Sequence, residues 1–381
     1  MKAFAHQTPD RTPLFEIFCA FHPIYWDICG RNAATDAILY WDALAEGITW
    51  EELVDLQVDA VFQVHKFFDV DIVRPAGTPG QDLPRPEKTG PLTWRQDGLD
   101  YVYNEHSNLV DPVIPVSYTH QKSEEATRKM IEEWEPTPWT PPDPEAFEVY
   151  RRVRVRAEAE GLDWLYMAEI GAGTGAAFYP PFMLMWLIAE PELFQRWLDI
   201  QKAGGFPYTA HLIEQGMELV AMGGDVSCDK GPFISPKHYH EFLLPVLQEH
   251  VNLIHEHGAK AIYTSDGNHW AIAQDFFFGT GVDGYKEVDQ AAGMTWPRLI
   301  EAGIDKQVCI LGNTDARYSL CLGTPEEVKT EVRQSLDYGR QSPGGHILHN
   351  SHSVHEDVRV ENYYAVIEAY REYFGLEPLP R

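Results

Sequence analysis

Apolar residues recur along the chain in short runs, and most of these runs end in polar or charged residues. Eight runs predict β-strands, because they are short, apolar or alternating, and bounded by glycine, aspartate and asparagine. They cover residues 12–20, 70–77, 163–171, 218–227, 259–267, 281–289, 306–315 and 344–352. Amphipathic stretches separate most of them, so the pattern predicts strands that alternate with helices.

The helix starts are marked by capping residues. Residues 235–258 and 324–341 open with Ser-Pro and Thr-Pro, an N-cap followed by proline at the first helical position. A further helix is predicted to open at 360–362. Alternating strands and helices indicate a parallel sheet, and eight units predict an α/β fold of the closed (β/α)₈ TIM-barrel type, with 1–381 as a single domain. A doubly wound open sheet is the alternative.

One segment interrupts this alternation. Residues 77–140 are rich in proline and charge and contain no obvious barrel strand. The sequence "WRQDGLDYVYNEH" within them predicts a β-hairpin, because an Asp-Gly pair separates two β-prone runs. We expect an insertion after the second strand that packs over the barrel mouth as a lid or cap.

Composition narrows the class of partner. The chain has 58 acidic and 30 basic residues, a formal net charge of −28. Nucleic acid and anionic membranes are therefore not expected partners, because both need a basic surface. Five cysteines occur without a CxxC pair, and the first residues lack an apolar signal core, so we expect a cytoplasmic protein. Homo-oligomerisation is left open.

The polar residues lie where a barrel carries its chemistry, at the carboxyl ends of the strands. Alternation predicts that Tyr285, Glu287 and Asp289 share one face of their strand. It likewise predicts that Leu348, Asn350 and His352 share a face, with His349 pointing the other way. Asp266, Glu287 and His352 are therefore expected to converge in the mouth. Two carboxylates and a histidine can bind a zinc-like ion or form an acid/base cluster. The competing interpretation is that each caps a helix or binds a loop amide. His346 and His349 are expected to support the strand.

Two aromatic stretches follow predicted strands and are expected to bind a flat ligand. The first, "FHPIYWDIC", includes Phe21, His22, Tyr25 and Trp26. The second, "AFYPPFMLMW", includes Phe178 and Tyr179. An ordinary helix core would account for about half of these residues, since aromatic side chains are also common core residues.

Several longer stretches resemble one protein family. They are "GPFISPKHYHEFLLPVLQEHVNLIHEHG", "YTSDGN", "LGNTDARYSLCLGTPEEVKTEVRQSL" and "GGHILHNSHSVHEDVRVEN". Together they resemble the uroporphyrinogen decarboxylase superfamily, which also contains zinc-dependent, corrinoid-linked methyltransferases. The resemblance covers roughly 163 to the C-terminus and implies a (β/α)₈ barrel.

The resemblance to the decarboxylases is incomplete. It implies an Arg-x-x-x-Arg pair after the first strand that binds substrate propionates, but here that stretch reads "EIFCAFHPIYW" and the first arginine is Arg31. Asp71 and His352 match the family's strand-two aspartate and late histidine. A metal-free decarboxylase or related lyase that uses these two residues is therefore one hypothesis.

The resemblance to the methyltransferases implies a zinc site of His-x-Cys and a late cysteine. Here Thr264, Asp266 and His352 stand at those positions, so oxygen and nitrogen ligands replace the thiolates. Such a site suits an oxygen substrate. We expect a methyltransferase that moves a methyl group from a small, aromatic methyl ether to the cobalt of a separate corrinoid protein.

In this hypothesis Asp266, Glu287 and His352 hold zinc or share protons. Glu16, Asp71 and Asn313 orient the methyl donor, and Glu16, Asp71 and His352 form the catalytic set. The decarboxylase is the second hypothesis, and a binding protein without catalysis is the third, because a fold alone does not imply function.

Overall fold

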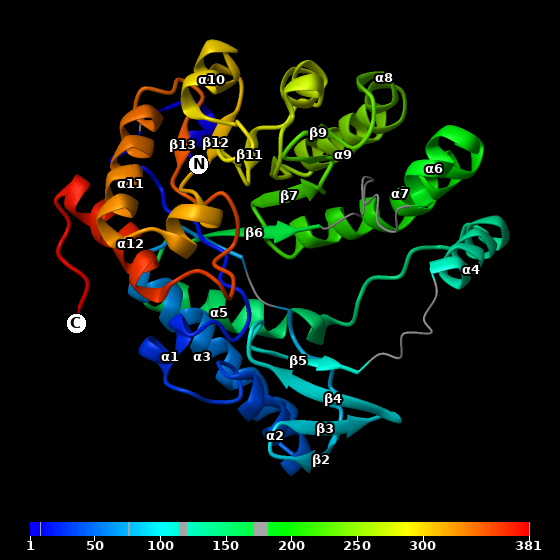
Figure 1. Ribbon diagram of the computed structural model, residues 1–381, viewed down its shortest axis with the longest axis vertical. Helices are drawn as coiled ribbons and strands as arrows, with labels where there is room; N and C mark the ends of the chain where they lie inside the picture. Colours follow the sequence, from blue (N-terminus) through cyan, green and yellow to red (C-terminus); the bar gives the residue numbers. More distant parts are fainter. Residues whose placement is uncertain (8, 75–76, 114–119, 171–181, 381) are drawn as a thin grey trace.

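The centre of the protein is a curled parallel sheet of seven strands, seen in a computed structural model that describes residues 1–7, 9–74, 77–113, 120–170 and 182–380. The strands are β1 (Ile72–Val73), β6 (Leu165–Glu169), β7 (Leu219–Gly223), β10 (Lys260–Thr264), β11 (Gly284–Lys286), β12 (Cys309–Leu311) and β13 (His346–Ile347). They lie in that order, each parallel to its neighbours. Helices surround the sheet (Figure 1). The predicted α/β fold with a parallel sheet is confirmed, and the open doubly wound alternative is not.

The first predicted strand, 12–20, forms only isolated bridges. Leu14 pairs with Leu348, and Phe15 pairs with Ile72, both in parallel. The Phe15 N–H donates to the Leu348 carbonyl at 3.0 Å, and the Asp71 N–H donates to the Leu14 carbonyl at 2.8 Å. This short segment therefore lies between β13 and β1, where an eight-membered ring needs its remaining strand.

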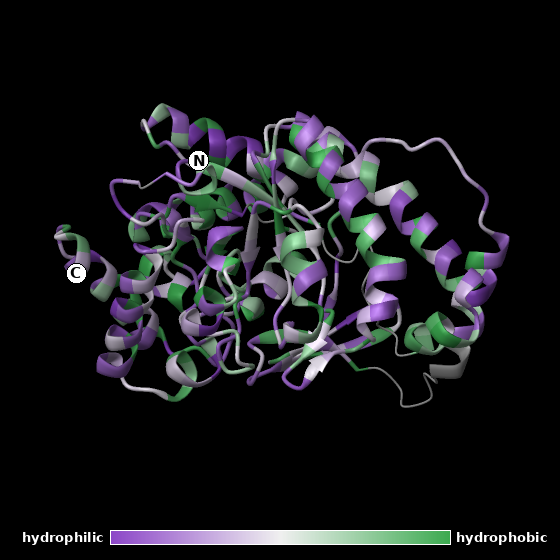
Figure 2. Ribbon diagram, turned by 90° about the horizontal axis from the view of Figure 1, so that it is seen from above, coloured by the Kyte–Doolittle hydropathy of each residue, from purple (hydrophilic) through white to green (hydrophobic). Residues whose placement is uncertain are grey.

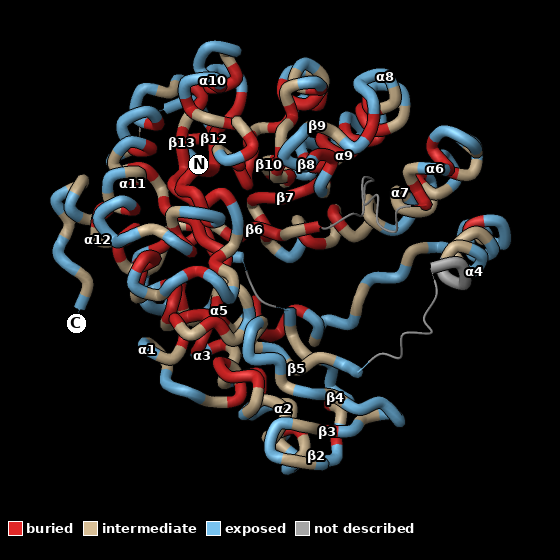
Figure 3. The backbone as a smooth tube through the Cα atoms, viewed as in Figure 1, coloured by how far each residue is buried: buried red, intermediate tan, exposed pale blue. Residues whose placement is uncertain are grey.

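The seven strands and the bridging segment 12–20 together are called the ring. Along the strands, side chains alternate between the inside of the ring and the surrounding helices. The inner layer includes Phe15, Ile72, Met167, Ile262 and Leu311. The short helix η1 (Ala3–Ala5) packs against this layer through Phe4. The opposite faces of the strands pack on the helices, and the strands are buried on both sides (Figure 3).

Helices form the outer layer, and in Figure 2 most of them intersperse apolar and hydrophilic positions along their length. The α-helices are α1 (Ile24–Cys29), α2 (Ala37–Glu46), α3 (Trp50–Phe68), α4 (His120–Glu133), α5 (Glu148–Ala159), α6 (Phe182–Ala189), α7 (Pro191–Glu214), α8 (Pro236–His238), α9 (Leu244–Glu256), α10 (Trp296–Glu301), α11 (Pro325–Gly339) and α12 (Val360–Phe374). The remaining short helical segments are η2 (Pro144–Phe147), η3 (Tyr239–Leu243), η4 (Trp270–Ile272), η5 (Gln274–Gly279), η6 (Ile304–Lys306) and η7 (Ala316–Leu320).

The predicted helix starts are confirmed. Thr324 and Glu327 form a capping box at the start of α11, Ser235 caps α8, and α12 begins at Val360. The stretch predicted over 235–258 is not one continuous α-helix, because the π-turn η3 separates α8 from α9. Pro245 lies just after this turn and has no N–H to donate to the preceding turn.

The segment between β1 and α5 holds a separate antiparallel sheet, which lies beside α2 in Figure 1. Its strands are β2 (Glu87–Gly90), β3 (Thr93–Gln96), β4 (Leu99–Asn104) and β5 (Leu109–Pro112). The predicted hairpin is confirmed as β3–β4, with Asp97 and Gly98 both at positive φ in its turn. The buried Trp94 anchors this sheet through its indole N–H, which donates to Asp42 of α2 at 3.1 Å. A lid function for 77–140 stays a prediction.

Among the described residues, no helix combines the length and the apolar character that crossing a bilayer requires.

Candidate active site at the barrel mouth

A cleft of about 770 Å³ opens at the carboxyl ends of the last strands, and we call it the mouth cleft. Asp266 reaches it from the loop after β10, Asp289 from the loop after β11 and Arg317 from η7. His352 lines it from the loop after β13. The cleft is also lined by Cys321 and His355, whose Sγ and Nε2 lie 3.8 Å apart. The described structure therefore brings Asp266 and His352 into one cavity, as the sequence predicted.

The Asp266 carboxyl group has a raised pKa. Burial is the largest cause, and the carboxylates of Asp225 and Glu287 add to it, so that the pKa of Asp266 is raised to about 6. Burial also raises the pKa of Asp225, and the negative charge of Glu287 contributes next. Such a group is partly protonated near neutral pH, which general acid catalysis requires.

A lysine lies beneath the cleft, and the sequence analysis missed it. Lys286 is fully buried, and its Nζ lies 2.7 Å from Oε1 of Glu287 and 3.0 Å from Oε1 of Glu169. Burial alone would lower the pKa of Lys286, but the two carboxylates outweigh it and the pKa is raised. Burial would likewise raise the pKa of Glu287, but Lys286 outweighs it and the pKa is lowered. Both groups are therefore charged. Arg74, after β1, binds Glu169 at 2.5 Å.

The available signal for Lys286 was its position inside an otherwise apolar strand. A buried ammonium group must be paired, so it points to carboxylates nearby. We expected Tyr285, Glu287 and Asp289 to share the inward face, and this was wrong for Tyr285. Tyr285 packs outward on Phe276 and Phe277, while Lys286 points inward. Glu287 has φ of +66°, which breaks the alternation just after the strand.

Glu16 lies deeper in the ring, beside His349. The Glu16 carboxylate accepts the N–H of Ile17 at 2.8 Å and an amide N–H of Asn350, and its Oε1 lies 3.4 Å from Nδ1 of His349. Burial is the main cause that raises the pKa of Glu16. Nε2 of His349 is buried and has no hydrogen-bond partner in the described structure.

The expected orientation of 348–352 was also wrong. Leu348, which was predicted to share the inward face with Asn350 and His352, packs among the outer helices. His349, predicted to point away, contacts Phe15 inside the ring at a ring-centroid distance of 4.7 Å. His352 still reaches the mouth cleft because it lies beyond the end of β13. His346 is a supporting residue as predicted, since its Nε2–H donates to the Gly312 carbonyl at 2.6 Å.

Asp71 does not lie at the mouth, and its predicted place there was wrong. It immediately precedes β1, at the amino end of the ring, where its carboxylate binds the Arg11 guanidinium through two contacts of 2.9 Å. It also accepts the Leu14 N–H at 2.7 Å. Active sites of such folds form at the other end, so this geometry makes Asp71 a structural residue that ties 11–14 to β1.

The predicted substrate-binding aromatic residues after segment 12–20 form hydrogen bonds and packing contacts with neighbouring parts of the fold. Nε2–H of His22 donates to the Val358 carbonyl at 3.0 Å, and the indole N–H of Trp26 donates to the Thr35 carbonyl at 2.7 Å. Tyr25 packs on Phe18, and Phe21 packs on Tyr40. None of the four lines the mouth cleft, so the competing interpretation as core residues fits them better.

Of the remaining predicted substrate-binding residues, Phe178 and Tyr179 lie outside the described residues. Asn313 is buried and faces the helix α11, where its Oδ1 lies 3.4 Å from the Ser335 hydroxyl. Its predicted contact with a substrate in the mouth has no counterpart in this arrangement.

The described side chains were also compared with the needs of a metal ion. No group of three histidine, cysteine, aspartate or glutamate side chains among them is placed to hold one. Glu287, a predicted ligand, is instead bound to Lys286. The described structure does not gather Asp266, Glu287 and His352 around a single point, and the zinc site stays a prediction.

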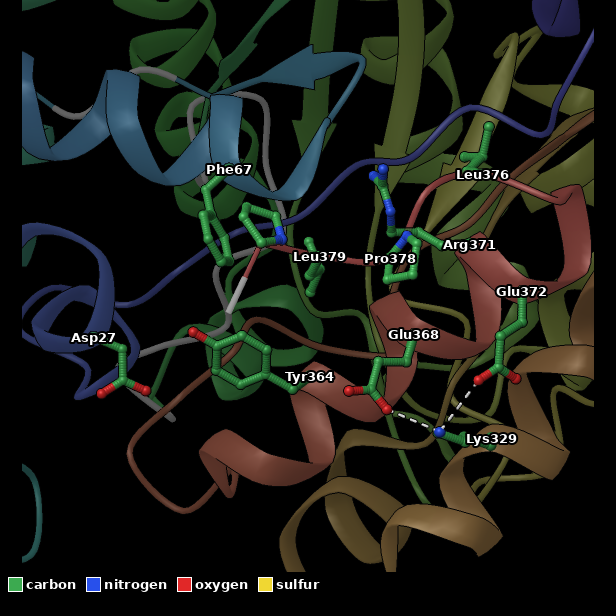
Figure 4. Close-up of a pocket in the computed structure, with 11 residues that line it drawn as sticks. Asp27, Phe67, Lys329, Tyr364, Glu368, Arg371, Glu372, Leu376, Pro378 and Leu379 are labelled. Atoms are coloured by element: carbon green, nitrogen blue, oxygen red, sulfur yellow. Dashed lines mark hydrogen bonds and ion pairs between the residues drawn. The ribbon is translucent and has the colours of Figure 1, made fainter.

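A second cavity, of about 700 Å³, lies on the outside of the ring against α12 (Figure 4). Its lysine, Lys329, is directed at Glu368 and Glu372, with the nearer contact at 2.8 Å. Phe67, Tyr364 and Leu379 form its apolar part. It lies away from the strand ends that carry the acids and bases, so the mouth cleft is the candidate active site.

Comparison with known protein families assigns this chain to one of them. Residues 166–373, more than half of the chain, match the uroporphyrinogen decarboxylase (URO-D) family, and the chain belongs to it. The matched region contains Glu169, Asp225, Asp266, Lys286 and His352, and therefore most of the mouth cleft.

Curated relatives carry the family name. A uroporphyrinogen decarboxylase of Mannheimia succiniciproducens is 28% identical over 217 residues, 55% of this chain and 55% of the relative. Another, of Actinobacillus succinogenes, is 28% identical over 255 residues, 61% of this chain and 66% of the relative. The matches thus span between 55% and 66% of the length of these relatives.

Proposed function

We propose that this protein is a carboxy-lyase that removes CO₂ from a small carboxylated compound without a metal ion. The observation that carries the proposal is the shared cleft of Asp266 and His352 above the buried Lys286. An acid and a histidine thus line one cavity, and the buried charges of Lys286 and Glu287 lie near the acid. The names of the curated relatives support the same reaction class.

The roles follow from the environment of each group. Decarboxylation breaks the bond between a substrate carbon and its carboxylate, and CO₂ leaves while the electron pair stays on the carbon. That carbon then needs a proton, which protonated Asp266 donates. The ionised Glu287 next to Lys286 helps to keep Asp266 protonated. His352 is exposed to water in the same cleft and returns a proton to Asp266.

The charges around the mouth cleft do not favour uroporphyrinogen, the substrate in the names of the relatives. Lys286 and Arg74 are already bound to Glu169 and Glu287. A compound with many carboxylates needs several cationic clamps. Of the described residues that line the mouth cleft, Asp266, Asp289, Glu356 and Asp357 are acidic. A smaller substrate with fewer carboxylates suits this charge balance.

The test incubates the purified chain with a small-molecule extract in D₂O and analyses the products by mass spectrometry. We expect a product that has lost CO₂ and gained one solvent deuteron on carbon, because Asp266 exchanges its proton with the solvent. Asp266→Asn should abolish this product. Asp97→Asn, on the β3–β4 turn, is the matched control and should leave it unchanged. A wild-type chain that forms no such product contradicts the proposal.

A second candidate is the corrinoid-dependent methyltransferase. The excess of carboxylates around the mouth cleft favours it, because an uncharged methyl ether is not repelled there. Asp266 would protonate the departing phenolate or alkoxide, and the methyl group would pass to cobalt(I) of a separate corrinoid protein. Zinc in this scheme is a further proposal.

This candidate has its own test. The purified chain, a panel of aromatic methyl ethers and cob(I)alamin are combined, and formation of methylcobalamin is followed by its absorbance. Methyl transfer in this assay, together with no CO₂ release in the D₂O experiment, would replace the lyase proposal. No methyl transfer, even with added zinc, contradicts the methyltransferase.

A further inference from the structure

Arg317 lines the mouth cleft and binds aspartates of two different loops. It lies in η7, after β12, and its guanidinium binds both carboxylate oxygens of Asp229, at 2.8 and 3.0 Å. A third contact, of 3.2 Å, joins it to Asp289. Asp229 lies in the two-residue turn between the short strands β8 (Ser227–Cys228) and β9 (Gly231–Pro232).

The two carboxylates that bind the Arg317 guanidinium differ in their exposure to solvent. The side chain of Asp289 is 7% exposed, while that of Asp229 is 59% exposed. An ion pair whose partners are both hydrated contributes little, so Asp229 can leave Arg317 at small cost. Asp289 is buried and stays. The guanidinium, 40% exposed, then presents a free pair of N–H donors to the cleft.

The charge of Arg317 also distinguishes it from the other described residues that line the mouth cleft. Of the described residues that line it, Arg317 is the one arginine or lysine. Asp266 and His352 line the same cavity. A substrate bound to Arg317 is therefore held in the cavity that contains the proposed proton donor.

We propose that Arg317 anchors a carboxylate of the substrate, and that Asp229 occupies this place in the free protein. This inference rests on the proposed carboxy-lyase function and names its substrate class. A planar guanidinium fork matches a carboxylate in two parallel hydrogen bonds. The substrate carboxylate replaces that of Asp229 one for one, so the charge held by Arg317 is unchanged.

The anchored carboxylate is not the one that leaves. Two N–H donors stabilise a carboxylate as the anion, which opposes its conversion to uncharged CO₂. The carboxylate that is lost must therefore be a second one, nearer Asp266. This geometry points to dicarboxylates as the substrate class, with one group for the single guanidinium and one for the reaction.

Binding of glutarate, a plain dicarboxylate, tests the anchor without requiring turnover. Its affinity for the full chain is measured by NMR titration with ¹⁵N-labelled arginine for wild type, Arg317→Gln and Asp229→Asn. The matched controls are Arg95→Gln and Asp100→Asn, since Arg95 and Asp100 form another solvent-exposed pair, on the small sheet. Circular dichroism of each variant checks that the chain is folded.

We expect Arg317→Gln to weaken glutarate binding by about tenfold or more, because a charge-assisted pair of hydrogen bonds is lost. Asp229→Asn should strengthen it, since the competing carboxylate is gone, and both control variants should match the wild type. Three results would each overturn the anchor: Arg317→Gln that binds as wild type, Asp229→Asn that binds no better, or no glutarate binding to either wild type or Asp229→Asn. The D₂O experiment on CO₂ release stays independent, so an anchor without decarboxylation, or the reverse, is recognised as such.

Discussion

Lys286 and Glu287 are neighbours in the sequence, yet their side chains meet inside the ring with 2.7 Å between Nζ and Oε1. Successive side chains of a regular strand point to opposite faces and cannot meet in this way. The positive φ of Glu287 turns its side chain back toward the interior. This single departure from strand geometry places a charged pair beneath the mouth cleft and next to Asp266.

The first prediction concerns the stability that this pair provides. Lys286→Met should lower the free energy of unfolding by about 3–5 kcal/mol, because Glu169 and Glu287 lose their buried partner. Urea denaturation at neutral pH measures the change. The double variant Lys286→Met/Glu287→Gln should recover part of the loss, since one uncompensated charge is then gone. Lys2→Met, which removes the exposed contact to Asp10, is the control and should leave the stability unchanged. Equal effects of Lys286→Met and Lys2→Met would contradict the buried pair.

The second prediction concerns pH and His269. Its Nδ1 accepts the Ser227 hydroxyl at 2.8 Å, and its Nε2–H donates to the Ser265 carbonyl at 3.1 Å, so the ring is neutral. Burial is the main cause that lowers the pKa of His269 to about 4. A histidine whose pKa is lower in the folded state binds a proton more readily when unfolded. Its stabilising contribution is therefore complete above the unfolded pKa, about 6.5, and is lost as the pH falls toward 4.

His269→Gln removes this titration. From about pH 7 to about pH 5 the wild type should lose about 2 kcal/mol more than the variant. Urea unfolding of both chains at the two pH values gives the comparison. Other buried histidines, such as His65 and His250, titrate alike in both chains and cancel. Parallel pH dependence of the two chains would show that His269 is not held neutral by its surroundings.

The third prediction separates two helical glycines. Gly204, within α7, faces open space, so Gly204→Ala should stabilise the protein by about 0.5–1 kcal/mol through helix propensity. At Gly339, the last residue of α11, an added Cβ would overlap the ring of His346. Gly339→Ala should cost about 1–3 kcal/mol, because the buried ring cannot move away freely. Thermal unfolding of the two variants measures both effects. A stabilising Gly339→Ala would contradict the packing of His346 on α11.

Seven of the eight predicted strands, three helix starts and the β3–β4 hairpin could be predicted from the sequence, because each depends on a local signal. Thr324 with Glu327, and Asp97 with Gly98, act within a few residues of one another. Glu287 could not be placed by alternation, because its conformation breaks the period on which alternation relies.

Errors of placement were larger where two distant parts of the chain meet. Asp71 was expected at the mouth because it matches the strand-two aspartate of the resembling family, but its contact with Arg11 lies at the opposite end of the ring. Arg317 was missed because its partner Asp229 is 88 residues away and no local motif joins them. Asp266 and His352 were placed together because both lie in loops that follow strands, and parallel strands end on one side of a sheet.

The measurement that tests this account most directly is the titration of the Asp266 carboxyl group by ¹³C NMR in the wild type and in Asp225→Asn. The account predicts a midpoint near 6 in the wild type, as burial and the neighbouring carboxylates require. It also predicts a lower midpoint in Asp225→Asn, because one negative neighbour is removed. A wild-type midpoint below about 4, the usual range of an aspartate, would contradict the role of Asp266 as the proton donor of the mouth cleft.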